Sequence, residues 1–149
     1  MKLIELALYF GGGIHFAILG ASALAPRALD WKGNLAGLPV MLRQLFWVYG
    51  AFIVIMIVSF GALSLRYAPG MAAGGGLGRA VAGLIAGFWG LRLAVQLFVF
   101  DAEEFLTNRW RRFGYGMLTA AFVVLSAIYG WAALGIDGAI FDWIRCKVS

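Results

Sequence analysis

The stretch GRAVAGLIAGFWGLRLAVQLFVFD, residues 78–101, decides the fold class of this chain. Between Arg79 and Asp101 every side chain is apolar except those of Arg92 and Gln96. About 20 such residues in a helix cross the roughly 30 Å hydrocarbon layer of a bilayer. A charged side chain at the middle of a span costs roughly 2.5–3.5 kcal/mol on insertion scales. The stretch therefore predicts a transmembrane helix in which Arg92 has a structural or functional purpose.

Three further apolar stretches of similar length flank this one. The four predicted spans cover residues 3–25, 44–65, 80–100 and 114–136. Of the 149 residues 63% are hydrophobic, against about 45–50% in soluble domains. A backbone in lipid must satisfy its own hydrogen bonds, which favours helices. The sequence predicts an all-α, integral membrane four-helix bundle that forms a single domain.

The three connections differ in composition. Residues 26–43 are rich in turn formers and could hold a short surface helix. The glycine-rich residues 67–78 predict a flexible loop. Asp101 and Glu104 have capping-box spacing, so residues 102–112 predict a short helix on the membrane surface between spans three and four. That helix would place four side chains among lipid headgroups, namely Arg109, Trp110, Arg111 and Arg112.

Charge and cysteine content narrow the class of partners. The formal net charge is +5, which in a membrane protein is typical of loops that lie against anionic headgroups rather than nucleic acid. Five basic residues on one side of the spans oppose six on the other, so the orientation is undecided. With Cys146 as the only cysteine, an internal disulfide is impossible, and no metal site is predicted.

Two features of the first span leave alternatives open. Its opening resembles a signal peptide, but Glu5 and His15 interrupt the apolar run, so we expect an uncleaved span. Small residues recur there at helical spacing, as they do at Gly83 and Gly87 in the third span. Such stripes let helices approach closely, either within this bundle or against a partner chain. The stripe of the first span consists of Gly13, Ala17 and Ala21.

A small set of polar residues is predicted inside the spans. At about 1.5 Å rise per residue, His15 and Arg92 lie near the centres of the first and third spans. Gln96 follows Arg92 by one turn on the same face. Tyr49 and Thr119 fall at the depth of Gln96, toward the side of residues 101–112. These positions predict a polar funnel that ends at Arg92 and His15.

Each member of this set has a structural and a functional interpretation. Arg92 is either an anchor, bonded by Gln96, Tyr49 and carbonyls and stacked on Trp89, or the site that binds an anionic or carbonyl-bearing ligand, or the partner of an acid on another chain. His15 is either a satisfied interior histidine or a proton donor or acceptor. The sequence holds no second histidine for a metal or haem, and no nucleophile motif for an enzyme.

Several motifs resemble the DoxX-like group of small bacterial four-helix membrane proteins. They are the G-x-x-H-F that contains His15, the LRQLFWVYG that opens span two, and the FWGLR that contains Arg92 with the later FD at Asp101. The resemblance covers most of the chain and implies a bacterial cytoplasmic (inner) membrane. It also implies that Arg92 and His15 touch a quinone or a lipid headgroup.

The sequence thus supports two main hypotheses. The first is a non-enzymatic membrane protein that binds a quinone-like or anionic amphiphilic ligand. Its candidate ligand-binding residues are Arg92, Gln96, His15, Tyr49, Trp89 and Thr119. The second is an accessory subunit of a larger membrane complex, or a homo-oligomer, in which the small-residue stripes and the RWRRF segment at 109–113 dock on a partner. A membrane enzyme is the third and least supported reading.

Overall fold

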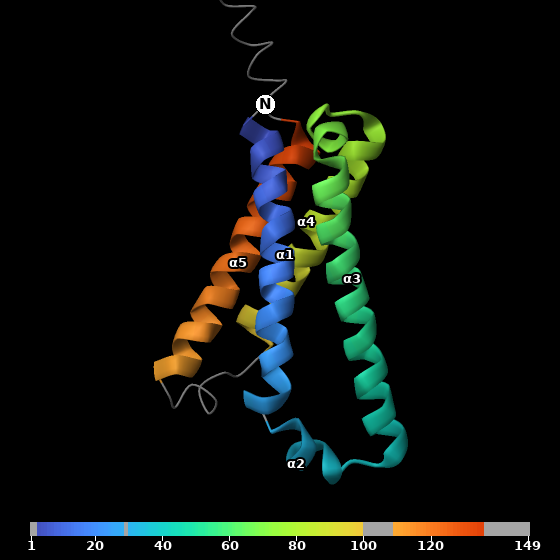
Figure 1. Ribbon diagram of the computed structural model, residues 1–149, viewed down its shortest axis with the longest axis vertical. Coiled ribbons are helices and arrows are strands. Elements are labelled where there is room, and N and C mark those ends of the chain that lie inside the picture. The colour runs from blue at the N-terminus through green and yellow to red at the C-terminus, as the bar shows by residue number, and fades with distance from the viewer. Residues whose placement is uncertain (1–2, 29, 100–108, 136–149) are drawn as a thin grey trace, which may run out of the picture.

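The computed structural model describes residues 3–28, 30–99 and 109–135, and within them the chain is helical with no strand. Five helices follow one another: α1 (Leu3–Ala28), α2 (Trp31–Ala36), α3 (Val40–Ala72), α4 (Gly76–Phe98) and α5 (Arg109–Leu134). Four of them, α1, α3, α4 and α5, are long and apolar enough to cross a membrane. The predicted all-α architecture with four long apolar helices is therefore confirmed (Figure 1).

The short helix that residues 26–43 could hold is present as α2. Its N-cap, Asp30, has a positive φ of 42° and accepts a hydrogen bond from the Gly33 backbone N–H at 3.4 Å. An aspartate cap of this kind satisfies one of the first free N–H groups of a helix. α1 continues past Pro26 to Ala28, so the turn between α1 and α2 is shorter than the sequence suggested.

The flexible loop predicted at 67–78 is wrong, because α3 continues as far as Ala72. The helix bends at Tyr67, whose φ of −122° and ψ of 18° are not helical, two residues before Pro69. Proline removes one backbone donor and clashes with the carbonyl four residues earlier, which explains the bend. Ala68 and Met71 are buried beyond the bend, so packing holds this last part of α3 against the bundle.

The predicted surface helix at 102–112 is corrected in part. Residues 102–108 lie outside the described residues. Arg109, Trp110, Arg111 and Arg112 form the first turn of α5 instead of the end of a separate helix. No proline separates them from the apolar part of α5, and Gly114 and Gly116 are accommodated within it. All four side chains are exposed.

The α5 helix ends at a glycine whose conformation requires that residue. Gly135 has a φ of +63°, and its N–H donates to the Trp131 carbonyl at 3.1 Å. This left-handed ending is a common way to terminate a helix. The guanidinium of Arg79, from the start of α4, lies where a side chain on Gly135 would project. The ends of α4 and α5 are thus joined closely at this point.

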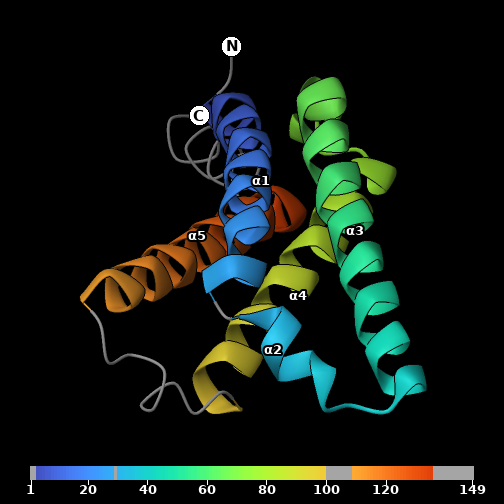
Figure 2. The ribbon, with the colours of Figure 1, turned by 60° about the horizontal axis from the view of Figure 1, so that its bottom comes forward.

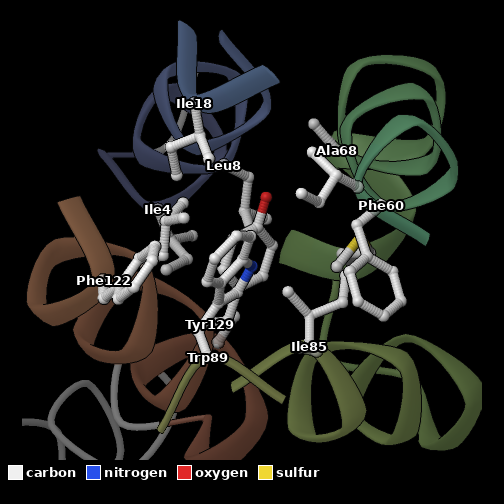
Figure 3. Packing of buried hydrophobic residues seen from close by; sticks show 14 residues of the cluster. Ile4, Leu8, Ile18, Phe60, Ala68, Ile85, Trp89, Phe122 and Tyr129 are labelled. Atoms are coloured by element: carbon white, nitrogen blue, oxygen red, sulfur yellow. The ribbon is translucent and has the colours of Figure 1, made fainter. Parts of the chain in front are cut away.

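The four long helices associate as two pairs, α1 with α3 and α4 with α5. The pairs meet at the end that holds the N-terminus of α1 and the C-terminus of α3. Toward α2 the pairs diverge, and α3 also separates from α1 (Figures 1 and 2). We call the first region the packed half. It contains the buried hydrophobic core, which Figure 3 shows around Trp89 and Tyr129. The core includes Leu8, Ile18, Ile57, Phe60, Ile85, Phe122 and Leu125.

The region toward α2 is the open half. It comprises residues 19–28 of α1, α2, residues 40–56 of α3, residues 90–98 of α4 and residues 109–121 of α5. Along α3 the change is abrupt, since Ile57 is 5% exposed but Ile53, one turn earlier on the same face, is 50% exposed. No stretch of α3 before Ile57 is buried against the described residues. The fold therefore joins a closed core to an end where α4 and α5 stay in contact while residues 51–56 of α3 are exposed.

Candidate functional site

His15 lies at the centre of the packed half with its side chain fully buried. Its Nδ1 is 2.7 Å from the Gly11 carbonyl oxygen, and the indole N–H of Trp89 donates to its Nε2 at 2.9 Å. A carbonyl can only accept, so Nδ1 carries the proton and Nε2 is the acceptor. Protonation of Nε2 would set two N–H donors against each other. The geometry corresponds to a neutral, satisfied interior histidine.

An aromatic shell surrounds the His15 imidazole. The rings of Phe60, Trp89 and Tyr129 meet it edge-on, with centroids 6.2, 5.4 and 5.7 Å away. Phe122 packs against Trp89, with ring centroids 4.9 Å apart. Edge-to-face contacts of this kind are favourable beyond the area they bury. Because the shell draws on α1, α3, α4 and α5, it holds the two helix pairs together.

Ser64 and Tyr129 belong to this cluster, and the sequence analysis missed both. The Ser64 hydroxyl donates to the Phe60 carbonyl at 2.7 Å and lies 2.5 Å from the Tyr129 hydroxyl. Since Ser64 already donates, Tyr129 is the donor in the second bond. Each residue is a polar group inside an apolar stretch, which was the available signal. This bond connects α3 to α5 across the core.

Gln96 and Thr119 are brought together, as their equal depths suggested. The Gln96 side-chain amide donates to the Thr119 hydroxyl at 2.5 Å, and Thr119 donates to the Tyr115 carbonyl at 2.9 Å. The Tyr115 hydroxyl donates to the Gln96 backbone carbonyl at 2.9 Å. Tyr115 was not among the predicted site residues. The three residues form a clamp that fixes α4 to α5 within the open half.

Arg92 lies on α4 between this clamp and the His15 cluster. Its side chain is half-buried, and its guanidinium carbon is 5.7 Å from the centroid of the Phe122 ring. Phe122 in turn packs on Trp89, whose indole N–H donates to His15, and the stacking of Arg92 on Trp89 stays a prediction. Arg92 is six residues before the end of α4, which corresponds to a depth of about 9 Å. The positive charge of Arg92 therefore lies between α4 and α5, away from the end of α4.

Tyr49 does not join these groups. It lies in the part of α3 that diverges from the other helices, and 60% of its side chain is exposed. The predicted polar funnel therefore divides into a closed cluster at His15 and Trp89, a clamp at Gln96 and Thr119, and Arg92 between them. The cause is the divergence of α3, which depth along separate spans could not reveal.

The chemistry that this arrangement offers is recognition of charge. The Ser64 hydroxyl is held by its two hydrogen bonds, and in the described part of the chain no His, Cys, Asp and Glu side chains gather in a group that could hold a metal ion. A guanidinium such as that of Arg92 is suited to pairing with a carboxylate, a phosphate or a polarised carbonyl. Comparisons with protein-family models, with curated proteins and with solved structures found no match to this chain.

Proposed function

We propose that this chain is an integral protein of the bacterial cytoplasmic (inner) membrane that binds an amphiphile, quinone-like or anionic, through Arg92. The length and apolar character of α1, α3, α4 and α5 support the membrane placement. The resemblance to the DoxX-like group supports the bacterial membrane. The protein acts by binding its ligand and carries out no reaction of its own.

The observation that carries the proposal is the position of Arg92. Its backbone lies about 9 Å inside the end of α4, its side chain is half-buried, and its guanidinium is 5.7 Å from the centroid of the Phe122 ring. A cation held at this depth in a span marks a functional site by default, because bringing it there is unfavourable. Arg92 also lies three residues after Trp89, at the boundary between the packed and open halves.

The remaining predicted residues have supporting roles in this proposal. The clamp of Gln96 and Thr119 fixes the α4–α5 pair and so positions Arg92. Trp89 and His15 close the inner end, because the Trp89 indole N–H donates to His15 Nε2 and His15 Nδ1 donates to the Gly11 carbonyl. Tyr49 stands on the exposed part of α3, away from the charged group.

The test is native mass spectrometry of the full chain extracted gently from its own membrane. The wild type should carry a bound small molecule that Arg92→Leu has lost. Arg66→Leu is the matched control. Arg66 also lies over an aromatic ring, that of Tyr67 at 5.3 Å, but it is near the C-terminal end of α3, away from Arg92. Equal retention in Arg92→Leu and the wild type would contradict the proposal.

A second candidate, an accessory subunit of a membrane complex, is favoured by the outer surface of α1. The stripe of Gly13, Ala17 and Ala21 is exposed, and a methyl group built on Gly13 would meet nothing within 4 Å. Small residues on a free helix face suit close packing by a partner helix. Co-purification of a stoichiometric polypeptide that Ala17→Phe displaces would support this function, whereas migration as a monomer after gentle extraction would contradict it.

A further inference from the structure

An uncharged stretch of α3 is bounded at each end by residue types that favour the membrane–water boundary. Residues 48–65 contain no Asp, Glu, Lys or Arg. Trp47 comes directly before this stretch, and Arg66 and Tyr67 come directly after it. Tyr67 follows Trp47 by 20 residues, a rise of about 30 Å in a helix. The hydrocarbon layer of a bilayer has about the same thickness, so the two boundaries are one hydrocarbon layer apart along α3.

Three aromatic side chains in mutual contact mark the first boundary, and we call them the aromatic anchor: Trp31 of α2 with Phe46 and Trp47 of α3. The rings of Trp31 and Phe46 meet edge-on with centroids 4.9 Å apart, and Trp47 lies 5.7 Å from Trp31. Tryptophan favours the level between headgroups and hydrocarbon. With six residues α2 is too short to cross a membrane. The aromatic anchor therefore ties α2 to this level, at the end of the molecule away from the bend of α3 (Figure 1).

Arg66 and Tyr67 mark the second boundary, where α3 bends. The guanidinium carbon of Arg66 is 5.3 Å from the centroid of the Tyr67 ring, and both side chains are exposed. Tyrosine is enriched at membrane–water interfaces, and arginine near the end of a span extends toward the headgroups. Tyr67 is also the residue whose backbone leaves the helical range. The bend of α3 thus coincides with the level at which the helix leaves the hydrocarbon.

The start of α4 supports this second level independently. A methyl group built on Gly78 would lie 2.8 Å from the Gly70 carbonyl oxygen and 3.0 Å from Met71 Cα, so α3 beyond its bend touches the first turn of α4. The next residue, Arg79, is exposed, and residues 80–91 after it are uncharged. An exposed charge is unfavourable in hydrocarbon. The part of α3 beyond the bend therefore lies outside the hydrocarbon, together with Arg79.

From these observations we infer that α3 has the lipid bilayer as its partner at a fixed depth. The aromatic anchor lies at one boundary of the hydrocarbon and the Arg66–Tyr67 pair at the other, and acyl chains cover the exposed side chains of residues 48–65. The helix α2 lies in the headgroup layer, where Lys32 and Asn34 are exposed. This inference rests on the membrane placement in the proposed function and adds the depth of each part of α3.

The experiment places one spin label at a time on the full chain in a Cys146→Ser background, reconstituted in phosphatidylcholine vesicles. Collisions of the label with oxygen, which concentrates in hydrocarbon, are compared with collisions with a water-soluble nickel chelate. The labelled positions are all exposed, namely Lys32 in α2 and Val48, Val58 and Leu65 in α3. The ratio of oxygen to nickel collisions should be highest at Val58, at least twofold lower at both Val48 and Leu65, and lowest at Lys32.

Replacement of the two tryptophans tests the aromatic anchor itself. Trp31→Ala combined with Trp47→Ala should raise the nickel accessibility of the Lys32 label at least twofold, because α2 is then no longer held at the boundary. Phe52→Ala is the matched control, since Phe52 is an exposed aromatic residue of α3 inside the uncharged stretch, and it should leave that accessibility unchanged. Size-exclusion chromatography of each variant checks that it is folded.

The possible contrary results separate the inference from the proposed function. A Val58 label more accessible to nickel than to oxygen would overturn the membrane placement and the inference together. Low accessibility of the α3 labels to both reagents would mean that protein covers residues 48–65, which overturns the inference alone. Equal ratios at Val48 and Val58, or equal effects of the tryptophan and Phe52 replacements, would also overturn the inference alone. Ligand binding by Arg92 is measured separately by native mass spectrometry.

Discussion

The packed half and the open half share the same four long helices, yet only the packed half has a core to which all four contribute. On α3 the buried face of the packed half combines the small residues Gly61, Ser64 and Ala68 with the bulky Ile57, Phe60 and Met71. The same face in the open half carries Phe46, Ile53 and Gly50, so bulky side chains predominate. In lipid, apolar character gives helices no reason to associate, whereas small residues and buried hydrogen bonds do.

The hydrogen bonds of the two halves connect different helices. The hydrogen bonds from Trp89 to His15 and between Ser64 and Tyr129 lie in the packed half and connect the two helix pairs. In the open half the clamp of Gln96 and Thr119 connects only α4 and α5, which leaves α3 apart. Substitutions of one residue type in both halves therefore test the comparison directly.

The largest difference in stability between the two halves is expected for replacement of a tryptophan by alanine. Trp89→Ala should lower the free energy of unfolding by about 3–5 kcal/mol, because it removes a fully buried aromatic side chain and strands the acceptor Nε2 of His15. Trp47→Ala, at a side chain that is 50% exposed, should change it by less than about 1 kcal/mol. Denaturant titration in detergent micelles measures both values. Similar losses at the two positions would break the comparison.

Gly61 and Gly50 lie on the same face of α3, and replacing each by alanine should give an intermediate difference in stability. A methyl group on Gly61 would lie 2.8 Å from Phe16 Cε2 and 3.1 Å from His15 Cβ, so Gly61→Ala should destabilise by about 1–3 kcal/mol through overpacking. Gly50 lies three turns earlier and has nothing within 4 Å. Gly50→Ala should be neutral or should stabilise by up to about 1 kcal/mol. Thermal unfolding of the two variants checks the sign, and a destabilised Gly50→Ala would show that this part of α3 is packed after all.

The smallest difference in stability is expected for replacement of a tyrosine by phenylalanine. Tyr129→Phe removes the hydroxyl that donates to Ser64, and Ser64 keeps its bond to the Phe60 carbonyl. No buried donor is stranded, so the expected loss is about 0.6–1 kcal/mol. Tyr49→Phe, at an exposed side chain, should have no measurable effect on unfolding. A larger loss at Tyr49 would place that hydroxyl in a contact that the open half does not show.

Periodicity and length predicted much of this fold. The four long helices followed from apolar stretches of about 20 residues, and the helical rise matched Gln96 with Thr119 across α4 and α5. The bend at Tyr67 was missed because Pro69 and the glycines after it suggested a loop, while the burial of Ala68 and Met71 depends on tertiary packing. The resemblance to the DoxX-like group stays a prediction.

The candidate site was harder to predict than the helices. Depth along a span locates a residue in one dimension, but rotation about the helix axis and the spread of the bundle decide which residues meet. His15 thus met Trp89 instead of Arg92, and Tyr49 lay outside the cluster. To predict which of these residues meet, the arrangement of α1 and α3 relative to α4 would have to be known.

The divergence of α1 from α3 is the central claim, and a distance measurement between spin labels in vesicles tests it most directly. In a Cys146→Ser background, one labelled pair replaces Gly13 and Ala62 in the packed half. The other replaces Leu24 and Ala51, each eleven residues nearer the α2 end on the same helix face; all four positions are exposed. We predict a longer mean distance for the Leu24–Ala51 pair than for the Gly13–Ala62 pair. Equal distances would mean that the helices run side by side to the α2 end, and the open half would not exist.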